Sequence, residues 1–164
     1  MLHGWLAAKN SVKDKDNNVP HNVWLCGDYS HDLNGFIPPV ITDIHFTELD
    51  NTHPTNGKYN IKLTRLEPET YYYNLQYHHT ITSEYYGKTA TLTVDVTSNL
   101  SGASSIQLGG SSKNYTAIPK GCHGTFSVSY TIPPDMTKLE CLIPTFSGPT
   151  TGTIYIDNII LKIQ

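Results

Sequence analysis

The chain closes with Gly152-Thr-Ile-Tyr-Ile-Asp-Asn-Ile-Ile-Leu-Lys-Ile-Gln164, the stretch that decides the fold. Its apolar positions are Ile154, Ile156, Ile159, Leu161 and Ile163. Their alternation slips by one residue at Asp157-Asn158, and a strand that buries one face therefore needs an extra residue there. The sequence predicts a β-bulge in a final strand. A carboxylate and an amide at such a bulge can hold a cation, tie this strand to another segment, or do both.

Other stretches show the same period of two. Their apolar residues that share a face are Tyr59, Ile61 and Leu63; Tyr71, Tyr73, Leu75 and Tyr77; Ala90, Leu92, Val94 and Val96; and Phe126, Val128, Tyr130 and Ile132. About seven such runs lie between residues 58 and 163, separated by Gly, Pro, Asn or Ser clusters, and none has a helical period. The pattern predicts an all-β sandwich or barrel.

The turn at Pro133-Pro134-Asp135-Met136 leads from the run ending at Ile132 to a run with Leu139, Cys141 and Ile143 on one face. We expect these two runs to form an antiparallel pair with one solvated face. Residues 99–121 are rich in Gly and Ser, and we expect mainly loops there, with one or two short strands.

Composition narrows the classes of function. The 164 residues suit one domain, which we place at residues 22–164 after a leader, linker or N-terminal arm over residues 1–21. A net charge of −3 and a charged fraction of 15% provide no basic stripe for phosphates, so we expect no nucleic-acid partner. No apolar run approaches the length of a membrane span and no signal peptide is visible, so we expect no membrane insertion.

The cysteines Cys26, Cys122 and Cys141 are odd in number. They are interpreted as small buried residues, with at least one thiol left over unless a second chain supplies a partner. Cys122-His123 lacks the second spaced pair that a structural zinc site requires, so zinc is not expected.

Two stretches resemble the opening and closing motifs of jelly-roll carbohydrate-binding modules. The opening stretch is Gly27-Asp28-Tyr29-Ser30-His31-Asp32-Leu33-Asn34-Gly35-Phe36, and the closing stretch is Tyr155-Ile156-Asp157-Asn158-Ile159 with Leu161. Residues 57–63 and 87–96 stand where the family has internal strands. The resemblance covers roughly residues 22–163 and implies a jelly-roll β-sandwich of two antiparallel sheets. Domains similar to these occur in secreted glycoside hydrolases, bacterial surface proteins, and tail or receptor-binding proteins of phages.

The resemblance also suggests a structural Ca²⁺ ion. Asp157 is the favoured ligand and Asp28 its partner, because Ca²⁺ selects carboxylate and carbonyl oxygens. The alternative is that Asp157 and Asn158 hydrogen-bond the chain near Asp28 with no metal. Ser30 stands where calcium-binding members have a carboxylate, so Asp157 is interpreted first as a residue that joins the first and last strands. Phe36 is a second departure, since the family often has Trp there.

The best ligand candidates lie on the strand over residues 70–80. Its face opposite the apolar set carries Tyr72, Asn74, Gln76 and His78, and Tyr85 and Tyr86 extend the surface. A sugar ring packs its C–H face on an aromatic ring and pairs its hydroxyls with amide and imidazole groups. The alternatives are an ordinary solvated sheet face or a face packed on a neighbouring subunit. The resemblance implies either a concave-face cleft or a loop-end site, for which His123 and Trp24 are candidates, although Trp24 also fits the core.

No catalytic constellation is visible, because Glu67, Glu69 and Glu84 lie in no recognisable motif and no Gly-x-Ser-x-Gly turn occurs. We therefore expect a non-catalytic, lectin-like domain that recognises cell-surface or polysaccharide glycans. The alternative is a structural, decoration or receptor-binding module of a phage or virus particle, in contact with other subunits or with a parent multidomain protein and serving host recognition. Both functions place the chain outside a cell or on a virion surface.

Overall fold

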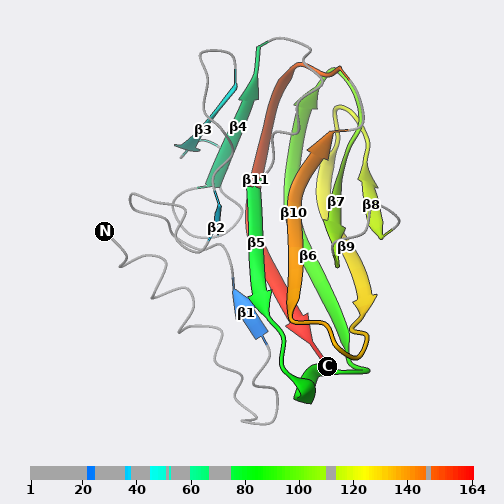
Figure 1. Ribbon diagram of the computed structural model, residues 1–164. Coiled ribbons are helices and arrows are strands. Elements are labelled where there is room, and N and C mark those ends of the chain that lie inside the picture. Colours follow the sequence, from blue (N-terminus) through cyan, green and yellow to red (C-terminus); the bar gives the residue numbers. More distant parts are fainter. Residues whose placement is uncertain are drawn as a thin grey trace.

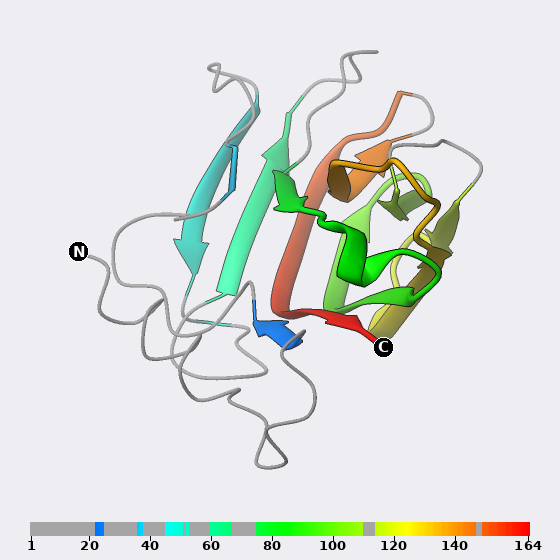
Figure 2. The ribbon, with the colours of Figure 1, turned by 60° about the horizontal axis from the view of Figure 1, so that its bottom comes forward.

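The computed structural model describes residues 22–24, 36–37, 45–50, 52, 60–66, 75–109, 114–146 and 149–164. In these ranges the chain forms two antiparallel sheets that pack face to face, which confirms the predicted β-sandwich (Figure 1). Figure 2 shows the two layers from below, with the C-terminus beside the end of the sandwich. Among the described residues, no helix is long and apolar enough to span a bilayer. The predicted arm over residues 1–21 lies outside the described residues, and β1 begins at Asn22.

Sheet A has five strands in one path and a sixth beside it. The path is β3 (His45–Asp50), β4 (Asn60–Arg65), β11 (Gly152–Ile163), β6 (Thr89–Leu100) and β9 (His123–Thr131), and β1 (Asn22–Trp24) also pairs with β11. Sheet B runs in the order β2 (Phe36–Ile37), β5 (Leu75–Thr80), β10 (Lys138–Phe146), β7 (Ser104–Leu108) and β8 (Tyr115–Ile118). A short 3-10 helix, η1 (Ser83–Tyr85), lies between β5 and β6 in the chain.

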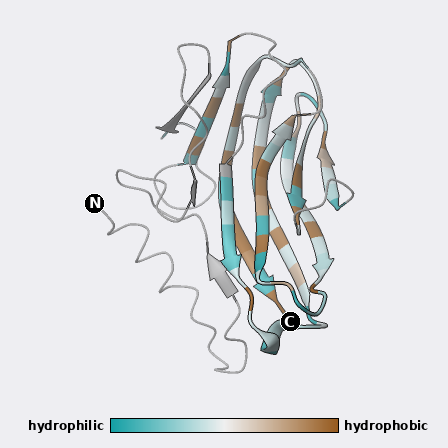
Figure 3. Cartoon of the chain, viewed as in Figure 1, coloured by the Kyte–Doolittle hydropathy of each residue, from teal (hydrophilic) through white to brown (hydrophobic). Residues whose placement is uncertain are grey.

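The core lies between the sheets and follows the predicted alternation. Sheet A contributes Ile61, Leu63, Ala90, Leu92, Val94 and Val96, and sheet B contributes Ile106, Leu108, Leu139, Cys141 and Ile143, all buried. Apolar and polar residues accordingly alternate along the strands (Figure 3). Each buried Leu or Ile side chain contributes about 2 kcal/mol to folding, so this face is the main source of stability.

The predicted bulge is present in β11. Asp157 pairs with Asp95 of β6, but the next paired residue, Ile160, faces Thr93, so β11 holds one residue more than β6 over this step. Asn158 has φ 48°, in the left-handed region that Asn tolerates better than most residues. Ile154, Ile156, Ile159, Leu161 and Ile163 are all 0% exposed. The extra residue therefore keeps both halves of the strand facing the core.

The bulge also marks a change of partner along one edge of β11. Before it, β4 pairs with the strand over Gly152 to Ile156. After it, β1 pairs with the strand over Ile160 to Lys162. The predicted junction between the first and last strands is therefore seen as β1–β11 pairing, whereas Asp28 lies outside the described residues.

Two details of the strand pattern differ from the expectation. The runs 126–132 and 139–143 do not pair with each other, because β9 joins sheet A and β10 joins sheet B. Alternation identifies the buried face of a strand but not its neighbour, and Pro133-Pro134 leads the chain across the sandwich. The one or two short strands expected in the Gly- and Ser-rich region are present as β7 and β8. The strand β3 was not expected at all.

Candidate functional site

The two described candidates on β5, Gln76 and His78, lie on the outer face of sheet B. Gln76 pairs with Leu142 of β10 and His78 pairs with Glu140. Along β10, Leu142 and Glu140 alternate with residues such as Cys141, which are fully buried in the core. Residues directly opposite in an antiparallel pair share a face, so Gln76 and His78 point away from the core, as predicted. Tyr72 and Asn74 lie outside the described residues.

A row of side chains crosses the outer face at the level of Gln76. Leu142 pairs with Gln107 of β7, and Gln107 pairs with Tyr115 of β8. Gln76, Leu142 and Gln107 are half-buried, and Tyr115 is 55% exposed. We call these four residues the outer row. Its strands are about 4.8 Å apart, so the row extends across about 14 Å of the sheet.

Neighbouring contacts hold part of this row in place. Nε2 of Gln107 donates to Oγ1 of Thr145 at 3.1 Å, and the Thr145 hydroxyl is also hydrogen-bonded to Ser105. Thr145 is 5% exposed, so its hydroxyl is a fixed acceptor. The Gln107 amide is therefore oriented before any ligand arrives, which lowers the entropy cost of a hydrogen bond to it.

An imidazole and a carboxylate lie beside the row on the same face. Nε2 of His78 is 3.2 Å from Oε2 of Glu140, an ion-pair distance, although the two groups are not aligned for a hydrogen bond. Their side chains are 25% and 29% exposed. Together with the row, they provide amide, imidazole and carboxylate groups around an apolar centre at Leu142. These are groups that pair with hydroxyls.

Tyr85 and Tyr86 do not lie on this face. The ring of Tyr85 meets His79 edge-on, with centroids 5.9 Å apart, and His79 stacks with Tyr77 at 6.2 Å. Tyr77 and His79 alternate with Gln76 and His78, so they lie on the other face of β5, where Tyr77, Tyr85 and Tyr86 pack against the core. Burial raises the pKa of both Tyr77 and Tyr85. The structure therefore places these tyrosines at the end of the core rather than beside Gln76.

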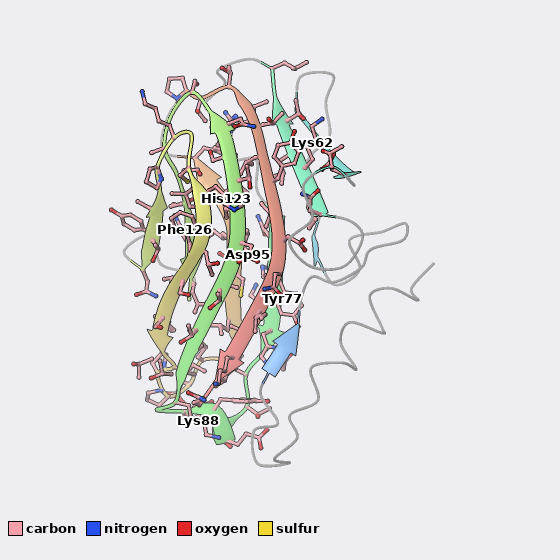
Figure 4. The ribbon with its side chains drawn as sticks, turned by 180° about the vertical axis from the view of Figure 1, so that it is seen from behind. Lys62, Tyr77, Lys88, Asp95, His123 and Phe126 are labelled. Atoms are coloured by element: carbon pink, nitrogen blue, oxygen red, sulfur yellow. The ribbon has the colours of Figure 1, made fainter. Side chains whose placement is uncertain are left out.

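The candidates for a loop-end site lie on sheet A. His123 is exposed at the start of β9, and its Nδ1 is 2.6 Å from Oγ1 of Thr97. The backbone of Trp24 pairs with Ile160 at the edge of β11. Figure 4 shows His123 and Asp95 on the side of the sandwich opposite the one seen in Figure 1. His123 and the outer row are therefore on different sheets and do not form one site.

The bulge places Asp157 in a polar but buried setting. Asp157 is 2% exposed, and its Oδ1 accepts the Asn158 backbone N–H at 2.7 Å. The Asn158 amide donates to Oδ2 of Asp95 at 3.3 Å. No cluster of three His, Cys, Asp or Glu side chains with metal-binding geometry occurs in the described part of the chain. Calcium at Asp157 with Asp28 stays a prediction, because Asp28 is not described.

The other functional candidates that the structure describes are two cysteines, Cys122 and Cys141, and one carboxylate, Glu84. Cys122 is half-buried and Cys141 is fully buried, and both are free thiols. Burial raises the pKa of both thiols, with the larger effect at Cys141. Glu84 is exposed on η1, where Oε1 accepts the Thr82 hydroxyl. Cys26, Glu67 and Glu69 lie outside the described residues.

Sequence reasoning missed Leu142, Gln107 and Tyr115. A signal was present for Leu142, since an apolar residue between the core residues Cys141 and Ile143 must point to the outer face. Gln107 and Tyr115 had no such signal, because the sequence predicted one or two short strands in the Gly- and Ser-rich region without indicating where each begins and ends. Their placement in one row depends on strand order, which the sequence did not provide.

The sandwich resembles solved carbohydrate-binding modules. The C-terminal family 22 carbohydrate-binding module of Clostridium thermocellum Xyn10B matches with a TM-score of 0.61 and 13% identity, over 92% of this chain and 97% of that one. A xylan-binding domain of family 22 matches with a TM-score of 0.58 and 14% identity, over 84% of this chain and 92% of that one. The fold is that of a jelly-roll carbohydrate-binding module.

A phage protein shares the same fold. The enzymatically active domain of tailspike protein 4 from bacteriophage CBA120 matches with a TM-score of 0.59 and 16% identity, over 81% of this chain. This chain spans only 20% of that tailspike chain. No family model matches the sequence, and no curated protein is similar to it in sequence. The predicted jelly-roll fold is thus confirmed by structure, at identities that show the fold alone.

Proposed function

We propose that this chain is a non-catalytic domain that binds a glycan on the outer face of sheet B. The observation that carries the proposal is the outer row, in which two amides flank an apolar residue and an exposed tyrosine ends the line. Leu142 and Tyr115 offer surfaces for the C–H face of a sugar ring. Gln76 and Gln107 offer amides that both donate to and accept from hydroxyls.

The length of the row indicates an oligosaccharide or polysaccharide rather than a single sugar. A ligand lying across β5, β10, β7 and β8 meets one side chain of the row on each strand, over about 14 Å. A single row of this kind has few contacts, so we expect weak binding, with avidity supplied by several copies on one particle or enzyme. The matched xylan-binding domain supports a polysaccharide as the class of ligand.

A binding screen tests the proposal. The isolated chain is applied to soluble and insoluble polysaccharides and to a glycan array, and the best ligand is measured by titration calorimetry. We expect saturable binding with a heat signal that the Leu142→Ala variant weakens. An absence of binding to every polysaccharide and array glycan, with the chain shown to be folded, contradicts the proposal.

The second candidate function is a component of a phage or virus particle, which the match to a tailspike domain favours. The two functions are compatible, since a particle-borne domain that binds host glycans performs both. Light scattering after size-exclusion chromatography separates them. A stable trimer or larger ring supports a particle component, and a monomer supports a tethered module of an extracellular protein.

A further inference from the structure

Side chains at β8 join the two sheets along one edge of the sandwich. Among the described strands, β8 ends sheet B and pairs only with β7, while β9 ends sheet A and pairs only with β6. The two end strands lie side by side (Figure 1). Alternate carbonyls of such a strand point away from its partner, so β9 presents hydrogen-bond acceptors toward β8.

Asn114, which precedes β8, and Thr116 within it supply donors to these carbonyls. Oγ1 of Thr116 donates to the carbonyl of Ser127 at 2.6 Å, and Nδ2 of Asn114 donates to the carbonyl of Ser129 at 2.7 Å. Nδ2 of Asn114 also donates to the carbonyl of Leu108 on β7 at 3.1 Å. The Asn114 amide therefore bridges the edge of sheet A and a strand of sheet B.

These two donors flank Tyr115, the exposed end of the outer row. Side chains alternate along a strand, so Asn114 and Thr116 face β9 while Tyr115 points to the outer face. Tyr115 is 55% exposed, whereas its two neighbours are half-buried. A four-residue strand at the end of a sheet has few contacts and opens locally unless other groups hold it. Anchors on both sides of Tyr115 therefore restrict the movement of its backbone.

We propose that Asn114 and Thr116 are positioning residues for glycan binding, which hold β8 against β9 and keep the Tyr115 ring in line with the rest of the outer row. The row continues from Tyr115 to Gln107 and Leu142 by direct strand pairing. A ring that is already in place loses less conformational entropy when a sugar packs on it. The inference rests on the proposed function, because Tyr115 acts only if the outer row binds a glycan.

Hydrogen exchange of the ligand-free chain tests whether these contacts hold β8. The anchor variant, Asn114→Ala with Thr116→Val, removes all three side-chain hydrogen bonds, and valine keeps the branched shape of threonine. We expect its β8 amides to exchange about fivefold faster than those of the parent chain, because the strand opens more often. Parent rates in the β8 amides of the anchor variant overturn the proposal.

Thr91→Val is the matched control for hydrogen exchange. It also removes a side-chain hydrogen bond to β9, since Oγ1 of Thr91 is 2.9 Å from Oγ of Ser129, but this bond lies on the outer face of sheet A. The β8 amides of Thr91→Val are expected to exchange at the parent rates. Faster exchange of β8 in this control, equal to that of the anchor variant, also overturns the proposal.

Glycan titration in a double-mutant cycle tests the coupling to Tyr115. With the best ligand of the polysaccharide screen, the anchor variant is expected to bind about two- to fivefold more weakly than the parent chain. In a Tyr115→Ala background the same two substitutions are expected to change the affinity less than about 1.5-fold, because the ring that they position is gone. Thr116→Ser keeps the hydroxyl and is expected to retain the parent affinity.

The titrations separate a failure of this inference from a failure of the proposed function. A parent chain that binds no glycan contradicts the proposed function and, with it, the positioning role. A parent chain that binds, while the anchor variant loses equal affinity with and without Tyr115 or loses none, overturns the positioning role alone.

Discussion

Gln107 of β7 lies directly opposite Leu142 of β10 on the outer face of sheet B. The pairing sets an oriented amide beside an apolar side chain in the middle of the sheet. Gln76 continues the line on one side and Tyr115 on the other. Because the four residues come from four different strands, the surface they form is a product of strand order. The proposed glycan-binding function depends on this row.

Removing one residue from the bulge is expected to unfold the domain. Deletion of Asn158 moves Ile159, Leu161 and Ile163 to the outer face, because side chains alternate along a strand. The loss of three buried side chains costs well over 4 kcal/mol, a large share of the stability of a typical domain. Circular dichroism and light scattering check the fold of the purified variant.

Asn158→Gly is the matched control for the deletion. It keeps the residue count and the left-handed conformation, while losing the hydrogen bond to Asp95. A change of about 1 kcal/mol or less in the free energy of unfolding is expected. A folded, cooperative deletion variant contradicts the role given to the bulge.

Gly109→Ala is expected to destabilise the sandwich by about 2–4 kcal/mol, through left-handed strain and overpacking together. Gly109 has φ 100°, and an added Cβ meets the ring of Tyr130 at 2.7 Å. Gly121→Ala is the control, since Gly121 has φ 63° but nothing within 4 Å of an added Cβ. The control is expected to cost only about 1 kcal/mol. Urea unfolding measures the loss of unfolding free energy in both variants. Equal losses rule out the contact with Tyr130 as the cause of the destabilisation at Gly109.

Alkaline pH is expected to weaken the fold through Cys141. Burial, with a smaller effect from Glu140, raises the pKa of this thiol far above the 9.0 of an exposed cysteine. Its contribution to stability is therefore complete below pH 9 and declines above it, as the thiol ionises in the unfolded chain only. Between pH 8 and pH 10 we expect a loss of about 1.4 kcal/mol from this residue.

Cys141→Ala isolates that contribution. The variant starts less stable because it leaves a small cavity, but its free energy of unfolding falls less between pH 8 and pH 10 than that of the parent chain. Urea titrations at the two pH values measure the difference. A parallel decline in parent and variant shows that Cys141 is not responsible.

Alternation along the chain was enough to predict an all-β sandwich or barrel, the bulge and the core face of most strands, and the family resemblance favoured the sandwich. At Asp157-Asn158 the prediction was specific because a single buried face allows only one explanation for a slip of one residue. The side on which Gln76 and His78 lie was also predictable, since alternation assigns faces without knowledge of neighbours.

Neighbours could not be predicted, and the site depends on them. The pairing of β10 with β5 and β7, rather than with β9, brings Leu142 and Gln107 beside Gln76. Tyr85 and Tyr86 were expected near Gln76 because they are close in sequence, but η1 leads them to the end of the core. Long-range pairing is fixed by the packing of the whole sandwich and leaves little trace in a local sequence pattern.

Two tyrosine variants distinguish binding at the outer row from binding at the surface with Tyr85 and Tyr86 that the sequence predicted. Tyr115→Ala is expected to reduce glycan affinity about three- to tenfold with little effect on the Tm, because the exposed ring packs on the ligand rather than on the core. Tyr86→Ala is expected to lower the Tm while leaving the affinity of the folded fraction unchanged. Calorimetry of both variants at a temperature where each is folded decides between the two surfaces. A loss of affinity in Tyr86→Ala, with unchanged affinity in Tyr115→Ala, assigns binding to the tyrosines at η1.

The most direct test of the central claim is the glycan affinity of Gln107→Ala, measured by titration calorimetry with the best ligand from the screen. An exposed amide on the other sheet, Asn99, provides the matched control Asn99→Ala. We expect Gln107→Ala to lower the glycan affinity about tenfold, because one oriented hydrogen bond to the ligand is lost, and Asn99→Ala to leave the affinity unchanged. Equal affinities for Gln107→Ala and the parent chain, with both folded, contradict a binding site on the outer face of sheet B.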